Sequence, residues 1–114
     1  MSYIDGMVAA VTTTRREEYR LHAQSFGGIL REHGALEVVD CWGDDVPDGE
    51  VTSFPMAVKC GKDETVVFSW IRWPSRAARD AGTTRVMADP RAQTDMPFDG
   101  KRVIIGGFEV ISES

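Results

Sequence analysis

Runs of apolar residues with strand character divide the chain into segments. These runs are rich in β-branched and aromatic residues, which fit a pleated, partly buried strand. The richest run, 65–73, is expected near the centre of a sheet. The predicted strands are Tyr3–Val11, Leu36–Trp42, Thr65–Trp73 and Arg102–Ile111, with a further short strand at Met56–Lys59.

A first helix is predicted between the first two strands. Thr14 and Glu17 have the spacing of a capping box, which places the helix start at Thr14. Gly34, directly after His33, is the expected left-handed stop. Apolar residues recur between these ends at helical spacing, at Tyr19, Ala23, Phe26, Ile29 and Leu30.

A second helix follows the run at 65–73. Ser75 has the side chain of an N-cap, and Pro90 disfavours helical geometry at Asp89, where the helix is expected to end. The order strand, helix, strand, strand, helix, strand predicts an α+β, ferredoxin-like βαββαβ domain covering residues 1–114. Such a domain has an antiparallel four-stranded sheet with both helices on one face.

The run at 65–73 carries bulky side chains on both of its faces. Val67, Ile71 and Trp73 share one register, and Val66, Phe68 and Trp70 share the other. Because two helices cover only one face of the sheet, the other face is expected to pack against a second sheet. The sequence therefore predicts a homodimer formed through the open sheet face.

Length, charge and cysteine content exclude several classes. With 114 residues, the chain can bury about two-thirds of its surface around a single core. No apolar run is long enough to span a membrane, and no basic segment with an apolar run precedes the first strand. Two cysteines cannot make a disulfide framework, so a cytoplasmic protein is expected. The net charge of −5 argues against a nucleic-acid partner.

Five separated motifs resemble the YbaA-like family of small, uncharacterised bacterial proteins. They are CWGDDVPDG at 41–49, TSFP at 52–55, VFSW at 67–70, VMADP at 86–90 and MPFDGKR at 96–102. The resemblance runs from about Tyr3 to Phe108. It implies the dimeric α/β-barrel fold, which is shared with antibiotic-biosynthesis monooxygenases, haem-degrading monooxygenases and muconolactone isomerases. It carries no established activity to this chain.

The superfamily resemblance implies a small-molecule pocket between the helices and the sheet. His22 shares the apolar face of the first helix, where it is either a core histidine or an acid, base or haem ligand. The haem-degrading relatives use an Asn, Trp and His set, and this sequence contains no asparagine. The predicted pocket residues are Tyr19, His22, Phe26, Trp42, Ser69, Trp70 and Arg72.

An acidic loop follows the second strand. Six carboxylates and no Lys or Arg occur between Glu37 and Glu50, but their spacing does not match a calcium-binding loop, so no metal or cofactor is predicted. We hypothesise that this loop approaches an arginine-rich edge of a second subunit. The arginines of that edge are Arg72, Arg76, Arg79, Arg85 and Arg91.

Three function classes are compatible with these residues, and none of them assigns a catalytic residue. The first is a small homodimeric protein that binds a small organic molecule, with chemistry at most like that of a cofactor-independent monooxygenase or isomerase. The second is a non-catalytic homodimeric interaction or structural module. The third is haem or metal binding through His22.

Overall fold

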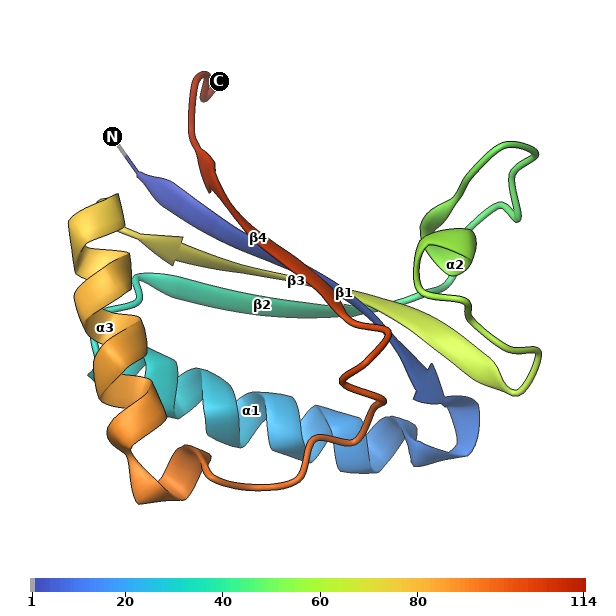
Figure 1. The fold of residues 1–114 in the computed structure, drawn as a ribbon, viewed down its shortest axis with the longest axis horizontal. Coiled ribbons are helices and arrows are strands. Elements are labelled where there is room, and N and C mark those ends of the chain that lie inside the picture. The colour runs from blue at the N-terminus through green and yellow to red at the C-terminus, as the bar shows by residue number, and fades with distance from the viewer. Residues whose placement is uncertain (1) are drawn as a thin grey trace.

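The computed structural model, which describes residues 2–114, contains one antiparallel sheet with two long helices beneath it (Figure 1). The strand order is β2-β3-β1-β4, as the ferredoxin-like fold requires. The strands are β1 (Tyr3–Thr12), β2 (Glu37–Trp42), β3 (Glu64–Trp73) and β4 (Ile104–Glu109). The helices are α1 (Arg16–Glu32), α2 (Phe54–Ala57) and α3 (Arg76–Ala88), with 3-10 turns at Thr13–Arg15 and Pro90–Ala92.

β1 and β3 form the centre of the sheet, as the sequence predicted for the third strand. They pair along their whole lengths, from Tyr3 opposite Trp73 to Thr12 opposite Glu64. β2 joins the outer side of β3, and β4 joins the outer side of β1. Because side chains alternate along a strand, Ser69 and Trp73 face the helices, whereas Trp70 faces the open side.

The core on the helix side is built around Trp73, which is 0% exposed. Tyr3, Leu30 and Val86 pack in the same cluster, joining β1 to both long helices. A smaller cluster lies on the open side of the sheet, where Val8, Ala10, Val58 and Val66 pack together. The segment between β2 and β3 therefore covers one end of the open face and leaves the remainder uncovered.

The predicted capping box at the start of α1 does not form. Thr14 lies in a 3-10 turn, and α1 begins at Arg16 with no side-chain cap. The Glu17 carboxylate instead accepts a hydrogen bond from Arg20 Nε at 2.9 Å. Because the helix starts at Arg16, Glu17 stands at the second helical position and not at the third, so the spacing of the box is lost.

The short strand predicted at Met56–Lys59 was wrong, because residues 54–57 form helix α2. Ser53 caps this helix, since its Oγ accepts a hydrogen bond from the Met56 amide at 3.1 Å. Pro55 occupies the first turn, where its missing N–H costs nothing. Local capping chemistry therefore outweighs the apolar character that favoured a strand.

The second long helix begins and ends as predicted. Ser75 Oγ accepts a hydrogen bond from the Ala78 amide at 3.1 Å, and Asp89 is the C-cap before Pro90. Neither α1 nor α3, nor any other helix within residues 2–114, combines the length and apolar character needed to cross a membrane.

Candidate functional site

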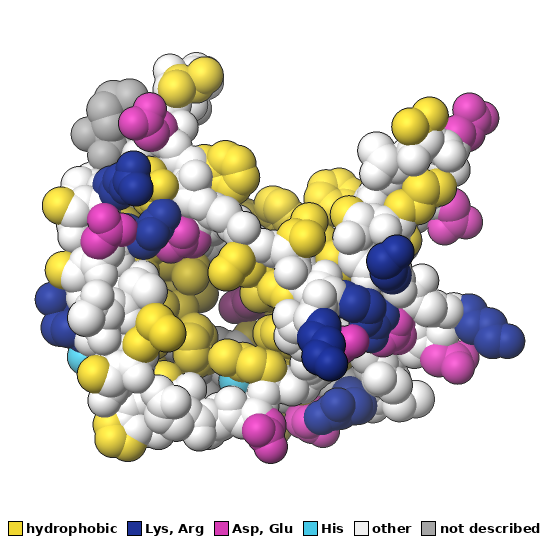
Figure 2. Space-filling model, in the orientation of Figure 1, with side chains coloured by type: hydrophobic (Ala, Val, Ile, Leu, Met, Phe, Trp, Pro, Cys, Tyr) yellow, Lys and Arg dark blue, Asp and Glu magenta, His cyan; other side chains and the backbone are white. Residues whose placement is uncertain are grey.

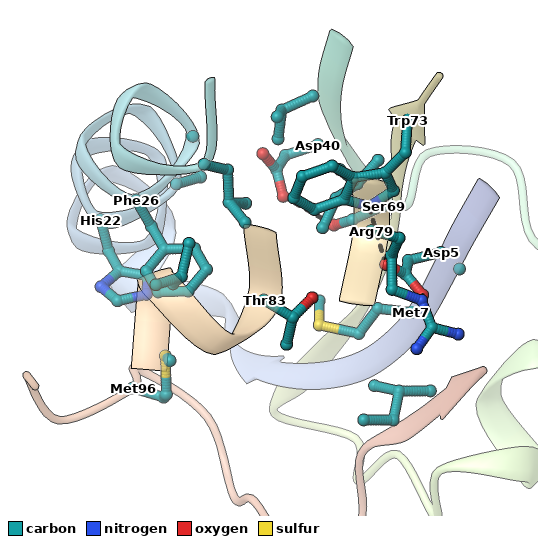
Figure 3. A pocket seen from close by; sticks show the side chains of 18 of the residues that line it. Asp5, Met7, His22, Phe26, Asp40, Ser69, Trp73, Arg79, Thr83 and Met96 are labelled. Atoms are coloured by element: carbon teal, nitrogen blue, oxygen red, sulfur yellow. Dashed lines mark hydrogen bonds and ion pairs between the residues drawn. The ribbon is translucent and has the colours of Figure 1, made fainter. Parts of the chain in front are cut away.

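A cavity of about 350 Å³ lies between the helix-facing side of the sheet and helices α1 and α3 (Figure 3). Most of its lining is apolar, including Met7, Phe26, Trp73 and Met96. In the space-filling view, hydrophobic side chains surround a hollow below the sheet (Figure 2). The cavity is therefore suited to a compact, largely apolar molecule.

Each wall of the cavity follows from the period of its element. On α1, Tyr19, His22 and Phe26 are three and four residues apart and therefore share one helix face. β3 contributes Ser69 and Trp73 from alternate positions. A third wall comes from α3, and Met96 and Phe98 of the segment before β4 close the side next to α1.

Asp40, Ser69 and Tyr19 form a polar cluster on the cavity wall. Ser69 Oγ donates to Asp40 Oδ1 at 2.6 Å, and the Tyr19 hydroxyl donates to the same oxygen at 3.4 Å. Burial raises the pKa of Tyr19 to about 12, so this hydroxyl stays protonated and available as a donor. The cluster places a carboxylate acceptor, held by two hydroxyls, at an otherwise apolar surface.

His22 lies beside Phe26 on the opposite wall of the cavity (Figure 3). The two rings are stacked, with their centroids 5.8 Å apart and their planes 16° apart. Burial lowers the pKa of His22, and the negative charge of Asp40 opposes this shift only in part. The lowered pKa favours the neutral imidazole, which has one ring nitrogen that can accept a proton and one that carries a proton.

A second polar cluster lies at the other end of the cavity. Trp73 Nε1 donates to Asp5 Oδ2 at 2.9 Å, and Arg79 Nε lies 3.3 Å from Asp5 Oδ1. Arg79 also donates to the Tyr3 hydroxyl at 3.0 Å. A Cβ atom at Gly107 would collide with the Tyr3 side chain as well as with the end of the Arg79 side chain, so glycine leaves room for both beside β4. The cluster locks α3 onto β1 and β4.

Sequence comparison assigns the chain to a family. The family described as "Protein of unknown function (DUF1428)" matches residues 2–100. The chain belongs to the DUF1428 family. It is similar to "Uncharacterized protein YbaA" of Escherichia coli K12 and of Shigella flexneri, each 51% identical over 114 residues and covering 97% of both chains. The predicted relation to YbaA-like proteins is confirmed.

Solved structures show the fold of this DUF1428 chain. "Structure of Rv0793 from Mycobacterium tuberculosis" has a TM-score of 0.54 and 14% identity, covering 100% of this chain and 99% of that one. An "uncharacterized NIPSNAP domain protein from Burkholderia xenovorans" has a TM-score of 0.57 and 18% identity, covering 96% and 95%. Both likenesses fit a ferredoxin-like fold, as predicted.

Four of the predicted pocket residues line the cavity of the DUF1428 chain, namely Tyr19, His22, Phe26 and Ser69. Trp70 and Arg72 do not, because they project from the opposite face of β3. Trp70 Nε1 donates to Glu37 Oε1 at 2.9 Å, and Arg72 Nη1 donates to Glu113 Oε1 at 2.6 Å. Trp42 lies on the helix side but outside the cavity, with its ring centroid 6.0 Å from that of Tyr19.

The polar residues that complete the cavity were not among the predicted ones. Strand alternation carried a signal for Asp5, which shares a face of β1 with the cavity residue Met7. Asp40 shares a face of β2 with Trp42 and needed only the register with Ser69 to be found. Arg79 had no local signal, because only the packing of α3 brings it to Asp5.

The arginines proposed for contact with a second subunit already bind groups of their own chain. Arg79 and Arg76 pair with Asp80, and Arg91 pairs with Asp89 and Glu32. Arg85 donates to the His33 carbonyl at 2.8 Å. Residues 2–114 also contain no cluster of three or more His, Cys, Asp or Glu side chains placed to hold a metal ion.

Proposed function

We propose that this protein binds one small, largely apolar organic molecule in the cavity, with a hydroxyl or similar donor of the ligand directed at Asp40. The observation that carries the proposal is an apolar cavity in which Asp40 offers a carboxylate acceptor, held by Ser69 at 2.6 Å, whereas the other carboxylate of the lining, Asp5, is engaged by Trp73 and Arg79. A hydrogen bond to a charged group contributes about 1.5–3 kcal/mol, so Asp40 would select ligands that have a donor.

The same arrangement supports proton transfer. The carboxylate of Asp40 would accept a proton from the bound donor, and the hydroxyls of Ser69 and Tyr19 would hold the carboxylate in place. His22, neutral on the opposite wall, could take up or return a proton at another atom of the ligand. Such proton transfers are the first step of isomerase and cofactor-independent oxygenase reactions. We propose no chemistry for this site beyond that step.

A pair of ligands, one with a hydroxyl donor and one in which a methyl group replaces the hydroxyl hydrogen, tests the proposal. We expect 2-naphthol to raise the thermal midpoint of the wild type, and 2-methoxynaphthalene, which has no donor, to raise it less. Asp40→Asn should weaken 2-naphthol binding about tenfold or more, and His22→Ala should reduce the shift for both compounds. Trp70→Phe, on the opposite face of the sheet, serves as the matched control.

Two outcomes would contradict the binding proposal. One is the absence of any shift in the wild type with either compound. The other is an equal shift in the wild type, Asp40→Asn and His22→Ala, since binding would then lie outside the cavity.

A non-catalytic homodimeric module is the second candidate. It is favoured by aromatic side chains on the open sheet face, where Phe68 is 40% exposed and Phe108 is 61% exposed. In Figure 2 hydrophobic side chains line the concave surface between the chain ends and the projecting segment that contains α2. A dimer that binds neither naphthalene compound would favour this candidate.

A further inference from the structure

A second depression lies outside the cavity, between α1 and the edge strand β2. It has a volume of about 550 Å³ and shares one wall with the cavity, formed by Tyr19, Ala23, Gly27, Val38 and Asp40. Trp42 and Val38 form its floor on the sheet side. This groove, which we call the α1/β2 groove, lies on the outer side of the wall that it shares with the proposed ligand cavity, and its arginines do not line that cavity.

Arginines line the helix side of the α1/β2 groove. Arg16, Arg20 and Arg31 share one face of α1, and all three are exposed. Arg20 is paired with Glu17, but Arg16 and Arg31 form no ion pair with any residue in the range 2–114. The Arg16 guanidinium lies over the ring of Trp42, 5.8 Å from its centroid. The groove is therefore a positively charged surface on a chain whose net charge is −5.

The sheet side of the groove is an unpaired strand edge. Within residues 2–114, β2 pairs with β3 only, so its outer N–H and C=O groups have no strand partner. Such an edge can bind an extended peptide as an additional strand. Side chains of that peptide on the helix side would lie toward α1, because Val38, Asp40 and Trp42 line the groove from that face of β2.

The spacing of the free arginines matches an extended peptide. Arg16 and Arg31 are fifteen residues apart, or about 22 Å along the helix axis. Six steps of an extended strand cover about 20 Å and return to the same face. Two acidic side chains six residues apart could therefore reach both guanidiniums. Between them Asp40 would repel a third acid and accept a hydrogen bond from a hydroxyl.

We propose that the α1/β2 groove binds an extended acidic peptide segment of a partner protein, which adds to the edge of β2. A nucleic acid fits less well, because its evenly spaced phosphates would meet the carboxylate of Asp40 and could not pair with the strand edge.

A labelled heptapeptide, acetyl-Glu-Thr-Val-Thr-Ser-Thr-Glu-amide, is the probe for fluorescence anisotropy. Its two acids, valine and serine share one face. The double variant Arg16→Gln with Arg31→Gln should weaken binding about tenfold, whereas Arg76→Gln, an exposed arginine on α3, should leave it unchanged. Replacing the central threonine of the peptide by proline should weaken binding at least as much, because proline removes a ladder hydrogen bond.

Hydrogen exchange separates strand addition from simple charge attraction. The peptide should slow exchange of the β2 amides that do not bond to β3, and circular dichroism should show that the double variant is folded. Equal binding of the proline peptide, unchanged β2 exchange, or tighter binding of a single-stranded oligothymidine of equal charge would each overturn the proposal. Because Asp40 lines both sites, the arginine variants, and not Asp40→Asn, distinguish the groove from the cavity.

Discussion

Gly82 is the residue that lets α3 pass close to Trp73. A Cβ atom at this position would lie 2.4 Å from Trp73 Cζ3 and 2.7 Å from the His33 carbonyl oxygen. The indole is 0% exposed and bonded to Asp5, so it cannot move aside without disturbing the second polar cluster. By contrast, a Cβ atom at Gly28 on α1 would meet nothing within 4 Å.

The two glycines give a matched prediction. Gly82→Ala should destabilise the protein by about 1–3 kcal/mol through overpacking, even though alanine favours a helix by about 1 kcal/mol over glycine. Gly28→Ala should stabilise it by up to about 1 kcal/mol, since only the helix preference acts there. Denaturant unfolding measures both values. Stabilisation by both substitutions would mean that Trp73 is not held as described.

Among the elements, the start of β3 and the segment before β4 are joined by Arg102. Its guanidinium bonds both carboxylate oxygens of Glu64, at 2.7 and 2.8 Å. It also donates to Asp99 Oδ2 and to the Lys59 carbonyl, both at 3.0 Å. The bond to Arg102, helped by the Gly61 amide, lowers the pKa of Glu64 to about 2. One side chain therefore ties together the end of the α2 segment, the start of β3 and the turn before β4.

The lowered pKa of Glu64 predicts an acid-dependent loss of stability. Because the folded-state pKa lies below the usual 4.5, the stabilisation is complete above about pH 4.5 and is lost as the pH falls toward about 2. Arg102→Gln should lower the thermal midpoint at neutral pH by several degrees and make the acid loss smaller. Thermal unfolding across this pH range measures the effect. Arg76→Gln, whose guanidinium is exposed, should match the wild type; an unchanged acid loss in Arg102→Gln would contradict the assignment.

The sequence allowed most elements to be predicted, because their signals are local. Strand composition located all four strands, and Ser75 and Pro90 located both ends of α3. Helix α2 was missed although Ser53 and Pro55 carry a cap signal, because the apolar character of the residues at 56–59 was weighted above it.

The candidate site was predicted only in part, for a different reason. Adjacent strand residues such as Ser69 and Trp70 cannot face one cavity, so alternation already opposed including both. The contact between Arg79 and Asp5 spans α3 and β1, and it depends on packing that no local pattern encodes.

As a whole molecule, the single chain has more surface than a compact monomer of its size. It exposes 7589 Å², whereas a monomer of 12.6 kDa exposes about 6,200 Å². Its radius of gyration is 14.6 Å, compared with about 13 Å for a compact domain of this length. The excess area exceeds the roughly 800 Å² that each partner buries in a standard interface. Phe68 and Phe108 are exposed on the uncovered part of the open sheet face, so a partner could bury apolar side chains there.

Two residues on opposite faces of β4 test whether that face is the dimer interface. Phe108 faces the open side, where its ring lies over Gly6 and Gly106, and Ile105 faces the helix side, where it is 78% exposed. We expect the wild type to sediment at twice 12.6 kDa and Phe108→Glu to sediment as a monomer, because a charge buried between two sheets has no partner. Ile105→Glu introduces the same charge on the other face and should leave the dimer intact. Since both side chains are exposed in the single chain, neither substitution should unfold it, and a monomeric wild type or equal behaviour of the two variants would place the interface elsewhere.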